Sequence, residues 1–191
     1  MANSKLIVVE GPQGAGKTTI TDFIRHKIPY TNLYRLSGSS DSSLAGKQKS
    51  VEMYTDLLDY IEKLQNKSIN LLFDRTFFTE AIYCRLGFKE FSYDDAFDEF
   101  LNRFAKLDFD IYYITLYLSD INEFEKRLAR DDKGVFKYAK FSVESSNIQQ
   151  EAYLKMSDEI KEKYGDKIHV VNIDTCVGLE GVKKQIEELL S

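Results

Sequence analysis

The segment from Glu10 to Thr19, which reads Glu-Gly-Pro-Gln-Gly-Ala-Gly-Lys-Thr-Thr, has the residue types and the spacing that bind phosphate. A Gly-x-x-x-x-Gly-Lys-Thr pattern lets successive backbone N–H groups point inward at the phosphate oxygens of a nucleoside triphosphate. Lys17 can reach the β- and γ-phosphates, and the Thr18 hydroxyl can bind Mg²⁺. The pattern therefore predicts a nucleotide site formed by Gly11, Gln13, Gly14, Ala15, Gly16, Lys17, Thr18 and Thr19.

Asp74 and Arg75 form a second candidate set, directly after an apolar run at 69–73 that has the length of a strand. Ligand sites in open α/β sheets occur where the strands end, so we expect both side chains to lie beside the segment 10–19, which we call the phosphate loop. Asp74 can bind Mg²⁺ together with Thr18, or accept a hydrogen bond from a substrate hydroxyl. Arg75 is suited to a bidentate contact with phosphate. A helix-capping aspartate beside a solvated arginine is the alternative.

Two aromatic residues, Phe77 and Phe78, follow this Asp-Arg-Thr turn. Stacking of one ring on a base and burial of both rings in the core are both open at this point.

A third set consists of Arg127 and Arg130, which are three positions apart and therefore share a helical face. They precede a charged, glycine-containing segment, and we interpret about 130–142 as a short lid. Phosphoryl transfer depends on positioning and on neutralisation of charge, and a closing lid would supply cations and exclude water. A solvated basic helix face is the alternative. The predicted catalytic residues are Lys17, Asp74, Arg75, Arg127 and Arg130.

Alternating strands and helices are predicted to position these residues. The run 6–9 reads as a strand before the phosphate loop, and Ile20, Phe23 and Ile24 follow the loop with helical spacing. Further strands are predicted within 30–36 and at 69–73, 110–118 and 167–173. Further helices are predicted at 49–65, 79–86, 93–106, after Asp120, at 142–164 and at 179–190. This alternation predicts a parallel sheet covered on both faces, in one α/β domain over 1–191.

The bulk composition bounds the class of protein. The 191 residues contain no apolar run near the ~18–20 residues that a membrane helix needs. The first five residues lead straight into the first strand, so we expect no signal peptide and a cytoplasmic protein. The net charge of −5 argues against a broad basic surface for duplex nucleic acid, while leaving room for a local cationic pocket.

These residues resemble the thymidylate kinase and deoxynucleoside kinase group of P-loop kinases. Segment 10–19 is similar to the group's Glu-Gly-x-x-Gly-x-Gly-Lys-[Ser/Thr]-Thr opening. Asp74-Arg75-Thr76, followed by Ala81 and Tyr83, is similar to the segment after the group's third strand, and 127–130 sits where the group carries lid arginines. The resemblance implies a three-layer α/β/α fold with a five-stranded parallel sheet in the order 2-3-1-4-5. It also implies Mg-ATP as donor and a deoxynucleoside or nucleotide as acceptor.

Two departures from the group bear on the acceptor. Gln13 stands where thymidylate kinases often carry an acidic residue, and Arg35-Leu36-Ser37-Gly38 stands where the group has a glutamate after the second strand. In the nucleoside kinases that glutamate is the general base, and such a base is worth ~10²–10⁴-fold for a hydroxyl acceptor. A phosphate acceptor is already anionic and needs cations instead. The absence of the glutamate, together with the presence of Arg35, Arg75, Arg127 and Arg130, favours a phosphate acceptor, although Asp74 remains open as a base.

Three hypotheses follow for function. The first is a Mg-ATP-dependent phosphotransferase acting on a deoxynucleoside monophosphate, with thymidylate or a modified pyrimidine nucleotide favoured. The second is a kinase of a hydroxyl acceptor, either a deoxynucleoside or a hydroxymethylated pyrimidine base in DNA, with Lys47, Lys49 and Lys137 near a groove. The third is a non-kinase nucleotide-binding regulatory module, which the sequence 172–175 disfavours because it lacks an Asn-Lys-x-Asp motif. A homodimer through helices 50–65 and 93–106 is left open.

Overall fold

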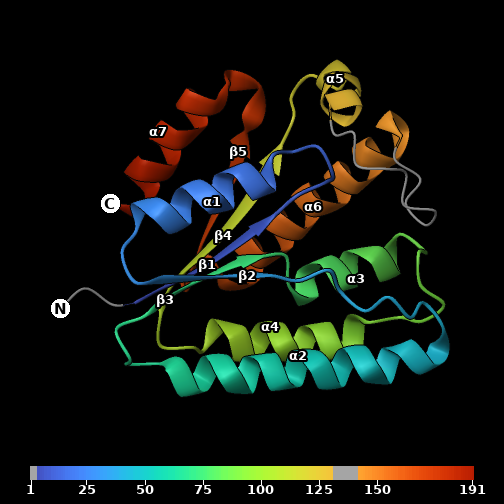
Figure 1. Cartoon of the computed structure of the whole chain (residues 1–191). Coiled ribbons are helices and arrows are strands. Elements are labelled where there is room, and N and C mark those ends of the chain that lie inside the picture. The colour runs from blue at the N-terminus through green and yellow to red at the C-terminus, as the bar shows by residue number, and fades with distance from the viewer. Residues whose placement is uncertain (1–3, 131–141) are drawn as a thin grey trace.

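The computed structural model describes residues 4–130 and 142–191, with the side chain of Arg130 outside the description. Five strands form one parallel sheet in the order β2-β3-β1-β4-β5, which confirms the predicted order (Figure 1). The strands are β1 (Lys5–Glu10), β2 (Thr31–Arg35), β3 (Asn70–Asp74), β4 (Asp110–Tyr117) and β5 (Ile168–Asp174). Helices connect them, as parallel strands require.

The helices lie at or close to their predicted positions. They are α1 (Lys17–Lys27), α2 (Leu44–Leu64), α3 (Phe77–Arg85), α4 (Asp94–Ala105), α5 (Asn122–Arg130), α6 (Val143–Tyr164) and α7 (Leu179–Leu190), with a 3-10 turn η1 (Thr175–Val177) after β5. Helix α2 starts five residues before the predicted position 49, because its first turn lacks an apolar period. Leu44 is 71% exposed there, and Gly46 packs so tightly on Asp41 that a β-carbon would lie 2.0 Å from the Asp41 carbonyl oxygen.

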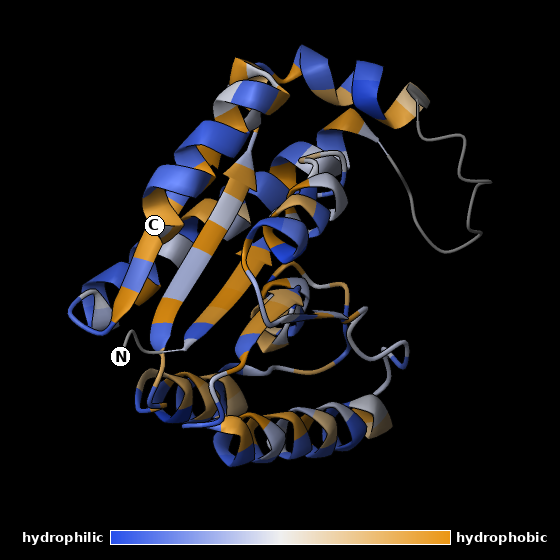
Figure 2. Ribbon diagram, turned by 60° about the vertical axis from the view of Figure 1, so that its left-hand side comes forward, coloured by the Kyte–Doolittle hydropathy of each residue, from blue (hydrophilic) through white to orange (hydrophobic). Residues whose placement is uncertain are grey.

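Helices cover the two faces of the sheet in separate layers. Side chains alternate along each strand, so Leu6 and Val8 of β1 face one core while Ile7 and Val9 face the other. The first core is completed by α2, α3, α4 and α6, and the second by α1 and α7 (Figures 1 and 2). The central strands β1, β3 and β4 are accordingly apolar along most of their length, while the outward helix faces are hydrophilic (Figure 2). This is the predicted three-layer α/β/α arrangement.

The register of the strands brings polar residues to one edge of the sheet. Val9 of β1 pairs with Asp74 of β3, Asp74 also pairs with Arg35 of β2, and Glu10 pairs with Thr115 of β4. All of these positions lie within two residues of the carboxyl ends of their strands, where ligand sites of open α/β sheets occur. Within the described ranges, no helix is both long enough and apolar enough to cross a membrane.

Candidate active site at the phosphate loop

The loop between β1 and α1 has the backbone geometry of an anion cradle. Gly11 has φ 142°, and a β-carbon there would lie 2.5 Å from the Leu116 carbonyl oxygen, so only glycine fits. Gly16 has φ 93° and precedes the first residue of α1, where it offers no side chain to cap the helix. The first N–H groups of α1 are therefore open to a phosphate at the positive end of the helix.

Lys17 lies inside this loop with 7% of its surface exposed. Its Nζ donates to the carbonyl oxygens of Gly11 and Pro12, each at 2.8 Å, so the ammonium sits within the cradle. Thr18 follows on the first turn of α1 and is exposed. The loop thus brings a cation and a hydroxyl to the amino end of α1, and their role as phosphate and Mg²⁺ ligands remains a prediction.

Arg75 is positioned by an unusual backbone conformation. It has φ 71°, in the left-handed region that costs a non-glycine residue of order 1–3 kcal/mol, and its N–H donates to the Val9 carbonyl oxygen at 3.2 Å. Its side chain is half-buried and donates from Nη1 to Tyr83 Oη at 3.2 Å. Burial alone would lower the pKa of this guanidinium, but Tyr153, Tyr83, Glu10 and Asp74 raise it, so the group stays charged. The strained turn therefore holds a permanent cation at the end of β3.

Asp74 is nearly buried beside Arg75, and a second arginine approaches it from β2. Arg35 Nε lies 3.7 Å from Asp74 Oδ2, and its Nη2 donates to Asp22 Oδ1 at 2.6 Å. The ends of β2 and β3 therefore place Arg35 and Arg75 beside Asp74, and Asp22 of α1 is the closer partner of Arg35.

Two residues of this arrangement have the chemistry to hold Mg²⁺. The described ranges contain no group of three or more His, Cys, Asp or Glu side chains that could hold a metal by themselves. Mg²⁺ bound with nucleotides needs only one or two protein oxygens, because phosphates and water complete its octahedron. The Thr18 hydroxyl at the loop and the Asp74 carboxylate at the neighbouring strand end fit that requirement.

Arg127 lies on the opposite side of the loop from Arg75. Its Nη1 donates to the carbonyl oxygen of Gly14 at 3.3 Å and to Thr175 Oγ1 at 2.8 Å, and its Nη2 donates to the Thr175 carbonyl oxygen at 2.8 Å. Arg127 thus ties the phosphate loop to the end of β5. The side chain of Arg130 and the predicted lid over 131–141 lie outside the described residues.

Glu10 is a site residue that the motif contained but for which sequence reasoning assigned no role. It is fully buried at the end of β1, and its oxygens accept hydrogen bonds from Thr76 N at 2.9 Å and Thr79 Oγ1 at 2.6 Å. Thr79 Oγ1 also lies 2.9 Å from Tyr153 Oη. Burial raises the pKa of Glu10 to about 7, against the lowering effects of Thr79 and Arg75. This carboxyl joins the root of the phosphate loop to the Asp74-Arg75 turn.

The raised pKa of Glu10 predicts a specific pH dependence of stability. Between the unperturbed value of about 4.5 and about 7 the folded chain holds the proton that the unfolded chain releases, so stability falls as pH rises through this window, by up to about 3 kcal/mol. Urea unfolding of Glu10→Gln between about pH 5 and about pH 7.5 should show this fall reduced relative to the unaltered chain. Glu99→Gln, on an exposed position of α4, is the control. Equal pH slopes for all three proteins would refute the assignment.

The structure decides the alternatives for several other predicted residues. Phe77 and Phe78 are 1% and 0% exposed and stack on each other in the core, so burial is correct for both rings. Lys47 pairs with Asp95 at 2.9 Å and Lys49 with Asp41 at 2.6 Å, while Lys137 lies outside the described residues. The lysines that can be described are thus neutralised by carboxylates rather than aligned along a bare cationic groove.

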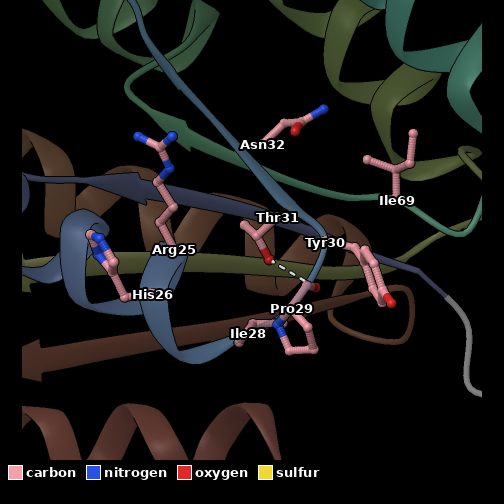
Figure 3. A pocket seen from close by; sticks show the side chains of 8 residues that line it. All are labelled: Arg25, His26, Ile28, Pro29, Tyr30, Thr31, Asn32 and Ile69. Carbon is pink, nitrogen blue, oxygen red and sulfur yellow. Dashed lines mark hydrogen bonds between the residues drawn. The ribbon is translucent and has the colours of Figure 1, made fainter.

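Two surface hollows lie away from this site. One, of about 560 Å³, opens where α1 ends and β2 begins, at the amino edge of the sheet. In Figure 3, Arg25 and His26 of α1 lie on one side of it and Tyr30 on the other. The second, of about 580 Å³, lies between α2 and α4. Neither is lined by a residue of the phosphate loop, so the chemistry of the carboxyl edge is separate from both.

Comparison with solved structures shows which known proteins share this fold. No family model and no curated protein matches the sequence. Among solved structures, the chain is similar to a thymidylate kinase from Candida albicans, with a TM-score of 0.72 at 18% identity, over 100% of this chain and 92% of that one. It is also similar to deoxyadenosine kinase from M. mycoides with bound dCTP, with a TM-score of 0.61 at 19% identity, over 97% of this chain and 98% of that one. A chain of the Pnkp1/Rnl/Hen1 RNA repair complex matches with a TM-score of 0.53 at 16% identity, over 82% of this chain and 46% of that one. The resemblance inferred from the motifs is confirmed at the level of the fold.

Proposed function

We propose that this chain is a Mg-ATP-dependent kinase that transfers the γ-phosphoryl group of ATP to a deoxynucleoside monophosphate, with thymidylate or a modified pyrimidine nucleotide as the favoured acceptor. The fold and the phosphate loop support the donor side of this proposal. One observation supports the identity of the acceptor. Arg75 is held at the end of β3 as a permanent cation, and within the described ranges its guanidinium makes a single side-chain hydrogen bond, to Tyr83. A guanidinium has five N–H donors, so most of them remain for an anionic acceptor.

The residues divide between the two halves of the reaction. The loop N–H groups and Lys17 would hold the donor phosphates, and Arg127 with Thr175 would border the donor on the β4–β5 side. Arg75 would bind the acceptor phosphate on the β2–β3 side, and Arg35 lies beside it, paired with Asp22 and Asp74. Thr18 and Asp74 would hold Mg²⁺, which neutralises charge on the β- and γ-phosphates.

The transfer itself needs no base when the acceptor is a phosphate. An anionic acceptor oxygen forms the new P–O bond while the bond from the γ-phosphorus to the β–γ bridging oxygen breaks, and ADP leaves. The chain's contribution is alignment and charge neutralisation, which supply most of the rate in this reaction class. The lid arginines Arg127 and Arg130, localisation in the cytoplasm and a homodimer remain predictions.

A hydroxyl acceptor is the second candidate, and Asp74 is the observation that favours it. This carboxylate lies at the strand end next to the loop, with Arg35 Nε 3.7 Å away, and can take a proton from a sugar hydroxyl. The DNA version of this candidate is weakened by the pairing of Lys47 and Lys49 with carboxylates.

A product assay separates these functions. The chain is incubated with ATP, Mg²⁺ and a panel of deoxynucleosides, deoxynucleoside monophosphates and DNA containing hydroxymethyluracil, and the products are separated. We expect monophosphates to become diphosphates. Phosphate gained by nucleosides or DNA but not by monophosphates would overturn the proposal in favour of the hydroxyl acceptor. Slow ATP hydrolysis with no transfer would favour the regulatory module.

A further inference from the structure

A buried ion pair lies beside the acceptor half of the site. Glu80 of α3 and Lys89, four residues beyond α3, have side chains only 1% and 7% exposed, and Glu80 Oε1 lies 3.2 Å from Lys89 Nζ. Burying two charges costs more than their attraction returns unless further hydrogen bonds satisfy them. The stability of this pair therefore depends on its further hydrogen-bond partners.

A single residue of the loop between β2 and α2 bridges both charges. Ser39 N donates to Glu80 Oε2 at 3.2 Å, and the Ser39 carbonyl oxygen accepts from Lys89 Nζ. The preceding residue is Gly38, where a β-carbon would lie 2.9 Å from Glu80 Oε2. The ion pair thus receives one N–H donor and one C=O acceptor that stand side by side.

Two polar atoms at the same place lack hydrogen-bond partners among the described residues. Tyr54 Oη is fully buried without one, and Glu80 Oε1 faces Lys89 without hydrogen-bond geometry. Tyr54 Oη and Glu80 Oε2 both lie within 4 Å of the point that a Gly38 β-carbon would occupy, at 3.9 Å and 2.9 Å. Unsatisfied buried polar atoms are rare in proteins and call for a water or a ligand.

The position of the pair relates it to the reaction. Thr79, the neighbour of Glu80, donates a hydrogen bond to Glu10, which immediately precedes the phosphate loop. The loop that contains Ser39 follows the carboxyl end of β2. Arg75 directly follows β3, which pairs with β2, and it begins the turn that leads into α3. An acceptor whose phosphate contacts Arg75 would therefore be bound next to the helix that carries Glu80.

We propose that Glu80 and Lys89 form the subsite that reads the base of the acceptor, and that Ser39 occupies this subsite until the acceptor displaces it. The inference rests on the proposed function, because it assigns the base to the acceptor of that reaction. The Ser39 N–H and C=O occupy the places that a ring N–H and an adjacent carbonyl of a base would take. Thymine, uracil and guanine each present such an edge. Glu80 accepts from the ring N–H, and Lys89 donates to the carbonyl oxygen.

We expect this subsite to bind nucleotides whose ring N–H is methylated much more weakly than the unmethylated nucleotides. A site built to hydrogen-bond a substrate group rejects an analogue that lacks the group, because its buried polar atoms are then left unpaired. We expect the Kd of 3-methylthymidine monophosphate to exceed that of thymidine monophosphate by at least about 100-fold. The same loss is expected for 1-methyl-dGMP against dGMP.

The first experiment uses the unaltered chain, so it does not depend on the folding of a variant. Titration calorimetry measures the Kd of dTMP, dGMP and their two N-methyl counterparts in the presence of Mg²⁺ and a non-hydrolysable ATP analogue. Equal affinity for each methylated and unmethylated pair would overturn the subsite, as would the absence of binding by both dTMP and dGMP. Discrimination without any ATP-dependent phosphorylation would refute the proposed function while supporting the subsite.

The second experiment assigns the discrimination to Glu80. In Glu80→Gln, a neutral amide oxygen would accept the hydrogen bond from the ring N–H, and this bond is weaker than one to a carboxylate. The preference for dTMP over its methylated form should therefore fall below about 10-fold. The Kd of the ATP analogue should stay unchanged. Glu180→Gln, which alters an exposed ion pair with Lys183 on α7, is the matched control and should keep the full preference. Full discrimination in a folded Glu80→Gln variant would contradict the assignment.

Discussion

Lys17→Ala is expected to lower the rate of phosphoryl transfer by at least about 10³-fold while the chain remains folded. The reason lies in the geometry of the loop. Lys17 Nζ sits within 2.8 Å of two loop carbonyl oxygens, Gly11 and Pro12, at the position where the β- and γ-phosphates of a donor would lie. Alanine removes the charge that, in the proposed function, stabilises the transferring group, and it leaves the surrounding N–H groups in place. Donor binding should therefore weaken less than turnover does.

The stability of this variant should change only modestly. Losing the two hydrogen bonds of Nζ costs about 1–3 kcal/mol, since net contributions to unfolding are near 1 kcal/mol for each. Transfer rates at saturating ATP, together with thermal unfolding by circular dichroism, separate the two effects. Lys27→Ala is the matched control, because Lys27 lies on the same helix and pairs with Glu187 at the surface. Near-normal turnover in Lys17→Ala would mean that the phosphate-loop assignment is wrong.

The fold was largely predictable because its elements follow strong local patterns. The strand over 110–117 and the helix over 179–190 carry apolar residues at the periods that burial in this fold demands. The order of the strands came from the resemblance to a kinase group rather than from any pattern within the strands. The first turn of α2 was missed because exposed Leu44 and tightly packed Gly46 give no periodic signal.

The residues of the candidate site were likewise predicted where a local pattern marks them and missed where it does not. Lys17, Asp74 and Arg75 were predicted because a motif or a strand end fixes their place along the chain. Glu10 and Glu80 escaped notice because an acidic residue reads as solvent-facing in sequence, whereas both are buried. Their burial depends on partners 66 and 41 positions away, Thr76 and Ser39, and such pairings are visible only once the chain is folded.

Arg75→Met is expected to raise the KM for a monophosphate acceptor by about 10²-fold, with the KM for ATP unchanged. Each hydrogen bond to a charged group is worth about 1.5–3 kcal/mol, so loss of a bidentate arginine contact accounts for an effect of this size. Methionine keeps an unbranched side chain with a β-carbon, so the strain at φ 71° is the same in both proteins. The comparison therefore isolates the guanidinium from the backbone.

A graded series tests what Arg75 recognises. Arg75→Lys keeps the charge but loses the planar fork, so it should fall between the unaltered chain and Arg75→Met. Tyr83→Phe removes the hydrogen-bond partner of Arg75 while keeping the cation, and its effect on acceptor KM should be the smallest of the three. Steady-state kinetics with each substrate varied in turn gives both KM values and kcat. If Arg75→Met changed kcat for a nucleoside acceptor but left the KM for monophosphates alone, Arg75 would serve a hydroxyl acceptor, and the phosphate-acceptor proposal would fall with it.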